Sequence, residues 1–180
     1  MREKYGIKFR EISKHLMEKN LEKENALEKF MELVHDINVC MFITNSIETD
    51  HTRPMATVDI DKDGILWFYT DIRSIKIEEV SMEHKVHLVY AHPGKESYID
   101  VWGQANVITD KVTVTNKWKP IMKAWFPGGP GDPNVALLKV KPYRIYYWDA
   151  EAGKMVSFLK IAAKSIGAKI SEGVEGSLKL

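Results

Sequence analysis

The segment from Ser97 to Ile108 constrains the fold most, because its side chains alternate between two kinds. Alternation with a period of two predicts a half-buried β-strand, with one face on a core and the other toward solvent. Small residues at 103 and 105 indicate a bulge or the close approach of another backbone. The apolar or small set is Ile99, Val101, Gly103, Ala105 and Val107, and the other set is Tyr98, Asp100, Trp102, Gln104 and Asn106.

Short strand patterns surround this segment, and most of them are joined by turns rather than by helices. Because strands do not alternate with helices, nothing calls for a parallel sheet. The predicted fold class is mainly β with flanking helices, a small antiparallel barrel. Further strands are predicted over residues 39–44, 54–60, 65–69, 86–90 and 134–148, and helices over 25–36, 74–82, 110–125 (split by Pro120) and 155–166.

The length of 180 residues suits one compact domain. Residues 1–24 are highly charged yet carry apolar residues at helical spacing, which predicts an accessory amphipathic helix or, equally, a solvated arm. The main domain is expected over residues 25–167, and a frayed C-terminal tail over residues 168–180.

Charge and composition exclude several classes of partner. The formal net charge is +1 and the basic residues are scattered, so neither nucleic acid nor a membrane surface is an expected partner. No stretch has the length and apolarity of a membrane span, and the single cysteine, Cys40, suits a reducing compartment, so a cytoplasmic protein is expected. The six histidines give no metal-ligand pattern, so no metal site is expected.

One strand-to-helix junction has the chemistry of an anion site. A predicted strand ends near Thr70, a helix opens at Ser74, and Lys76 lies in its first turn. Backbone N–H groups at a helix start attract anions, a lysine adds a full charge, and the hydroxyls can donate to phosphate oxygens. We call Thr70, Ser74 and Lys76 the phosphate cup. By spacing alone, a plain helix cap at Ser74 with a solvated Lys76 is the commoner arrangement.

Two other groups of residues fit a large planar ligand. Arg53 stands at the head of a strand, where it can reach a phosphate, and Pro54-Met55-Ala56 would offer a mostly apolar rim. Tryptophans near element ends can cover a flat ring while their N–H stays hydrogen-bonded. An edge strand with a surface arginine, and tryptophans in a core or interface, are the alternatives. The tryptophans are Trp102, Trp125 and Trp148.

Five segments taken in order resemble the pyridoxamine-phosphate-oxidase-like FMN-binding split barrels, and most closely their general-stress-protein branch. The resemblance covers roughly residues 25–160 and implies a Greek-key split β-barrel. It also implies a homodimer with FMN held in the grooves between subunits. The segments are Arg53–Ala56, Phe68–Thr70 with Ser74–Lys76, Trp102–Ala105, Trp125–Gly129 and Arg144–Asp149.

The resemblance also implies roles for individual residues. Arg53, Thr70, Ser74 and Lys76 are placed at the FMN phosphate, Tyr69 and Thr70 close over the flavin, and Trp148 reaches the flavin of the other subunit. The residues expected to bind FMN are Arg53, Pro54, Met55, Ala56, Tyr69, Thr70, Ser74, Ile75, Lys76, Gln104, Trp125 and Trp148.

Departures from the family pattern narrow the expected function. Val58 and Ile75 stand where relatives carry phosphate-reaching cations, and no Arg-x-His motif follows Trp148, so vitamin B6 oxidase activity is not expected. We expect an FMN flavoprotein that is an oxidoreductase for a small molecule the sequence does not identify, with no catalytic acid or base standing out. The alternatives are a non-catalytic flavin-binding stress protein, or a split barrel that holds a deazaflavin or haem.

Overall fold

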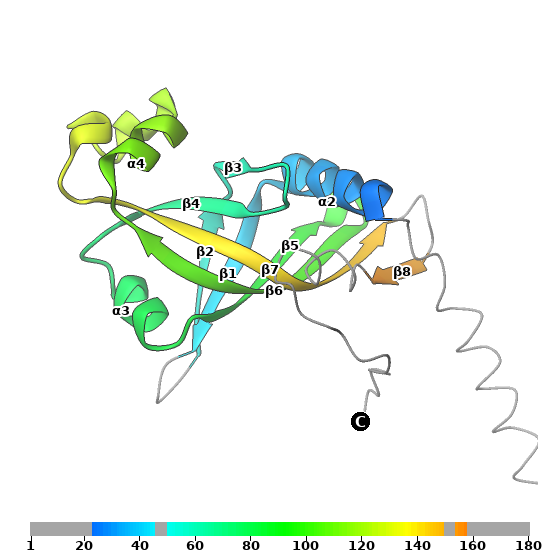
Figure 1. Ribbon diagram of the computed structural model, residues 1–180. Helices are drawn as coiled ribbons and strands as arrows, with labels where there is room; N and C mark the ends of the chain where they lie inside the picture. Colours follow the sequence, from blue (N-terminus) through cyan, green and yellow to red (C-terminus); the bar gives the residue numbers. More distant parts are fainter. Residues whose placement is uncertain (1–22, 46–49, 150–153, 158–180) are drawn as a thin grey trace, which may run out of the picture.

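The computed structural model describes residues 23–45, 50–149 and 154–157, and within them eight strands form one antiparallel sheet (Figure 1). The strands are β1 (Val39–Asn45), β2 (Asp50–Ala56), β3 (Asp59–Ile60), β4 (Leu66–Asp71), β5 (Lys85–His92), β6 (Ser97–Ile108), β7 (Val135–Asp149) and β8 (Lys154–Ser157). Their order is β2-β1-β5-β6-β7-β4-β3, with β8 added beside β7. The mainly β fold class with an antiparallel sheet is confirmed.

Three α-helices and three short 3₁₀ segments complete the described residues. The α-helices are α2 (Lys23–Ile37), α3 (Ile75–Met82) and α4 (Lys111–Lys117), and the 3₁₀ segments are η1 (Pro93–Lys95), η2 (Pro120–Ala124) and η3 (Gly129–Gly131). Figure 1 shows α2 and α3 toward opposite ends of the curled sheet. None of these helices is long and apolar enough to cross a bilayer.

Strand β4 is buried on both faces because a separate hydrophobic core packs against each of them. On one side Phe68 meets Phe42 edge to face, with ring centroids 5.3 Å apart, in the large core that α2 covers with Phe30 and Val34. On the other side Trp67 and Tyr69 join a smaller core with residues of α4, η2 and β7. Strand β4 therefore lies between the two cores, and this packing holds Thr70, near the end of the strand, in a fixed position.

The strand predicted over residues 54–60 is wrong in its bounds. Strand β2 begins earlier, at Asp50, and pairing stops after Ala56. The N–H of Thr57 donates to the carbonyl of Asn38 at 2.8 Å, whereas the N–H of Val58 donates to the carbonyl of Trp67 at 2.8 Å. The chain thus changes partner from β1 to β4 at this step, which joins the two edges of the sheet.

The alternation predicted over residues 97–108 is confirmed, and so is the irregularity at its small residues. The register of β6 against β7 shifts between Trp102 and Gly103. A Cβ atom at Gly103 would lie 2.7 Å from Val140 Cγ1 and 3.0 Å from the Lys141 carbonyl oxygen, so the neighbouring strand requires glycine here. The predicted break at Pro120 is also present, since α4 ends at Lys117 and η2 begins at that proline.

The helix predicted from Met155 is wrong over the residues that can be checked. Lys154–Ser157 form β8, in which Met155 pairs with Trp148 of β7. The apolar spacing that suggested a helix is local, and it carries no information about a partner strand that supplies backbone hydrogen bonds. The rest of that prediction, the extension before residue 23 and the tail from 168 lie outside the described residues.

Candidate functional site

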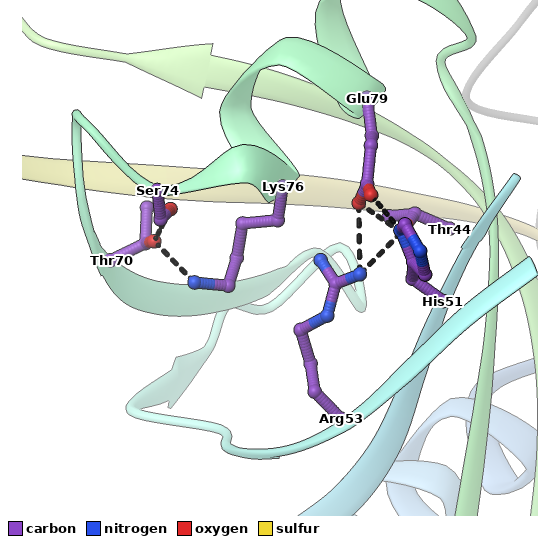
Figure 2. Close-up of polar contacts among 7 residues, drawn as sticks. All are labelled: Thr44, His51, Arg53, Thr70, Ser74, Lys76 and Glu79. Atoms are coloured by element: carbon purple, nitrogen blue, oxygen red, sulfur yellow. Dashed lines mark hydrogen bonds and ion pairs between the residues drawn. The ribbon is translucent and has the colours of Figure 1, made fainter. Parts of the chain in front are cut away.

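The three residues of the phosphate cup come together at the junction of β4 and α3 (Figure 2). The Lys76 ammonium donates to Thr70 Oγ1 at 3.1 Å, and the hydroxyls of Thr70 and Ser74 lie 3.0 Å apart. The Ser74 side chain makes no capping hydrogen bond to the helix backbone, and Lys76 is half-buried. The structure therefore does not show the simple cap with a solvated lysine.

Arg53 of β2 lies opposite the cup and has one nitrogen to spare. Its Nη2 donates to Glu79 Oε2 at 2.8 Å and to Thr44 Oγ1 at 3.0 Å. Its Nη1 is buried and has no hydrogen-bond partner among the described residues. Figure 2 shows this nitrogen turned toward the side where Lys76 lies.

An anion between Arg53 and Lys76 would satisfy both cations. Burial lowers the pKa of the Lys76 ammonium, and the positive charge of Arg53 lowers it further. A buried unpaired donor and two facing cations are each costly, and an anionic oxygen would offset both costs. With two hydroxyls beside them, these donors suit a phosphate group, so the residues present fit a phosphorylated ligand.

Glu79 is a member of the site that the sequence reading missed. It lies on α3, is only 5% exposed, and accepts hydrogen bonds from Thr44 Oγ1 (2.5 Å), from Arg53 and from His51. Burial alone would raise the pKa of its carboxyl, but these three bonds outweigh burial and lower it to about 2. Its one signal in the sequence is its position three residues after Lys76, on the same side of a predicted helix.

The residues next to Arg53 and Lys76 in the sequence differ in burial and in the face that they occupy. Met55 points into the large core, whereas Pro54 and Ala56 are exposed on the opposite face of β2. Ile75 is 61% exposed at the start of α3. Val58, the other position without a cation, packs against the smaller core.

Tyr69 and Thr70 point to opposite sides of β4. The Tyr69 hydroxyl donates to the Lys117 carbonyl at 2.6 Å, and its ring meets Trp118 edge to face at 5.7 Å. Tyr69 is thereby held in the smaller core, where burial raises the pKa of its hydroxyl. Of the pair expected to close over the flavin, Thr70 lies in the cup and Tyr69 points away from it.

Three expected flavin contacts lie elsewhere in the chain. Gln104 is exposed on β6, and Trp125 follows η2 and is 67% exposed. Trp148 pairs with Tyr98, whereas Ala136 of the same strand pairs with Thr70. Positions 136 and 148 differ by twelve residues, which at about 3.3 Å per residue is on the order of 40 Å of strand.

The outer face of the sheet carries an apolar surface that we call the outer sheet face. Trp102 at its centre stacks on His87 of β5 at 4.2 Å between centroids, and the Arg144 guanidinium of β7 lies 3.9 Å from the Trp102 ring. Hydrophobic residues on β1, β6 and β7 extend this face. They are Val39 (48% exposed), Met41 (42%), Tyr98 (38%) and Trp148 (42%).

Comparison with known proteins identifies relatives of this chain and of its fold. The chain is 26% identical over 166 residues to Protein bli-3 of Neurospora crassa, covering 86% of this chain and 72% of that one. It is 28% identical to General Stress Protein 26 from Bacillus anthracis (TM-score 0.60, 67% of this chain, 92% of that one). A general stress FMN/FAD binding protein from Xanthomonas citri shares the fold at 24% identity (TM-score 0.63, 86% and 99%).

The family described as "Pyridoxamine 5'-phosphate oxidase like" matches residues 25–172, which is most of the chain and includes the cup, Arg53 and the whole sheet. The chain therefore belongs to the pyridoxamine 5'-phosphate oxidase like family.

Proposed function

We propose that this protein binds FMN, with the phosphate between Arg53 and Lys76, and that it is an oxidoreductase for a small molecule. The observation that carries the proposal is the buried Nη1 of Arg53, which turns toward the side of Lys76 and finds no partner within residues 23–45, 50–149 and 154–157. The similar Xanthomonas citri protein, which is described as FMN/FAD binding, supports a flavin as the ligand.

Each residue of the site has a distinct task in this proposal. Lys76 and Arg53 supply the two positive charges. The hydroxyls of Thr70 and Ser74, which lie within hydrogen-bond distance of each other, would donate to phosphate oxygens instead. The backbone N–H groups at the start of α3 add a partial positive charge. FMN, when bound, supplies one- and two-electron transfer, while the protein provides binding and orientation.

The chromophore of the purified protein tests the identity of the ligand. We expect a yellow protein that releases a compound co-eluting with FMN on heating, and an apoprotein that binds FMN more tightly than riboflavin because only FMN carries the phosphate. A colourless protein that leaves the fluorescence of added FMN unquenched would contradict the proposal. Reduction of the bound flavin followed by reoxidation by small acceptors tests the oxidoreductase part, and a flavin that never cycles points to a binding protein instead.

We further propose that the protein is a homodimer that associates through the outer sheet face. A sheet face with four exposed hydrophobic side chains is unusual for a surface that stays in water. Trp148 lies too far along β7 to reach the cup of its own chain, so a role at a flavin requires a second subunit. This arrangement gives the exposed tryptophan a partner.

Analytical ultracentrifugation at micromolar concentration is expected to give twice the mass of the 20.7 kDa chain. Met41→Glu places a charge on the outer sheet face and is expected to shift the mass to that of a monomer, because an unpaired charge is costly to bury. The matched control is Met82→Glu on α3, where the side chain is 64% exposed and the dimer should persist. A monomeric wild-type protein would refute the dimer.

A further inference from the structure

We propose that Glu79 is a positioning residue for the phosphate ligand, which acts by holding Arg53 so that Nη1 remains free for the anion. The inference rests on the proposed phosphate site and assigns a role to a residue that has no charge complementarity with a phosphate. Glu79 need not contact the ligand in this arrangement.

The contacts divide the Arg53 guanidinium into two functional halves. Nη2 donates to Glu79 Oε2 and Thr44 Oγ1, and Nη1 has no hydrogen-bond partner in the described part of the chain (Figure 2). An arginine side chain carries roughly 2 kcal/mol of rotamer entropy, and its planar shape transmits the orientation of one nitrogen to the other. Fixing Nη2 before the ligand arrives therefore lowers the cost of binding.

Glu79 is itself held from three positions on two strands. Thr44 of β1 and Arg53 of β2 contact Oε2, while His51 of β2 contacts Oε1. The side chain is 5% exposed, so it has little freedom to follow Arg53 elsewhere. The carboxylate is thus a fixed point from which Arg53 is oriented.

Charge shows why this role differs from direct binding. A carboxylate beside a phosphate repels it, so Glu79 would weaken binding if it acted only through its charge. The net charge of Arg53, Lys76 and Glu79 is +1, from two cations and one anion. Glu79 favours phosphate binding only by keeping Arg53 in place, which makes its effect conditional on Arg53.

A double-mutant cycle tests this condition, with FMN and riboflavin as ligands and flavin fluorescence as the readout. Glu79→Asp keeps the charge but draws the carboxylate away from Arg53, and it is expected to raise the Kd of FMN about 5- to 10-fold, a coupling of the usual size for contacting residues. The Kd of riboflavin should stay within about twofold, since riboflavin has no phosphate. In an Arg53→Gln background, Glu79→Asp should have no further effect on FMN.

The matched control is Glu78→Asp, which makes the same change at an exposed position of the same helix and should leave both ligands unaffected. Thr44→Val, which removes the second partner of Nη2, provides an independent variant and should also weaken FMN selectively. If circular dichroism shows that Glu79→Asp does not fold, the Thr44→Val variant tests whether holding Nη2 of Arg53 favours FMN binding.

The outcomes separate this inference from the identity of the ligand. Equal weakening of FMN and riboflavin, or the same loss with and without Arg53, would mean that Glu79 acts through the fold, and the inference would be wrong. If wild-type protein binds no FMN, titration with inorganic phosphate replaces it. Phosphate binding that depends on Glu79 only when Arg53 is present would then support the positioning role while the flavin proposal fails.

Discussion

Replacing Thr70 and Lys76 together by alanine is expected to weaken FMN binding by roughly 30- to 2,000-fold. The two side chains lie 3.1 Å apart and would both contact the phosphate. A hydrogen bond from a charged donor contributes about 1.5–3 kcal/mol and one from a neutral hydroxyl about 0.5–1.5 kcal/mol, so the pair accounts for about 2–4.5 kcal/mol. Flavin fluorescence titration measures the change, and riboflavin affinity should move far less.

The matched control for this variant is Thr115→Ala with Lys119→Ala. Thr115 is exposed on α4, and Lys119 is exposed just after that helix. Their replacement also removes one hydroxyl and one ammonium, but away from the cup. FMN affinity should be unchanged in the control. If the Thr70 and Lys76 variant binds FMN as tightly as the wild type, the assignment of the phosphate to this cup is wrong.

Acid is expected to remove about 3 kcal/mol of stability that depends on Glu79. The pKa of its carboxyl is lowered in the folded protein from the ordinary 4.5 to about 2, so the unfolded chain binds a proton first as the pH falls. The contribution is therefore complete above about pH 4.5 and is lost between pH 4.5 and 2. Urea unfolding across pH 2–6 measures the free energy of unfolding.

Glu79→Gln isolates this contribution from that of other carboxyls. The pKa of Asp71 is also lowered to about 2, through its hydrogen bonds with Arg73, so some acid sensitivity remains in any variant. The glutamine variant should be less stable at neutral pH and should lose less stability across the same interval. Parallel curves for the two proteins would show that Glu79 does not stabilise the folded state by this route.

The parts of the fold that follow from local pattern were predictable. Alternation from Ser97 to Ile108 specified both faces of β6, and Pro120 specified where α4 could not continue. Errors occurred where a distant strand decides the outcome. The break after Ala56 depends on backbone bonds to Asn38 and Trp67, and β8 depends on pairing with β7.

The candidate site likewise has a part that could be predicted from local sequence and a part that depends on the fold. Thr70, Ser74 and Lys76 are close in sequence, so their proximity could be read from a strand followed by a helix. Glu79 is 26 residues from Arg53 and 35 from Thr44, and a glutamate in a charged helix ordinarily indicates a solvated surface. Only the curling of the sheet brings Thr44 of β1 and Arg53 of β2 against Glu79 of α3 and buries that carboxylate.

The long strand β7 has a consequence for assembly. One end pairs with β4 beside the phosphate cup, and the other carries Trp148 on the outer sheet face. In the proposed dimer, one continuous strand would then link the cup of its own subunit to the flavin of the other. Ligand occupancy and subunit association become a single coupled equilibrium, in which each favours the other by the same factor. Dilution would then release the flavin, and the flavin would hold the subunits together.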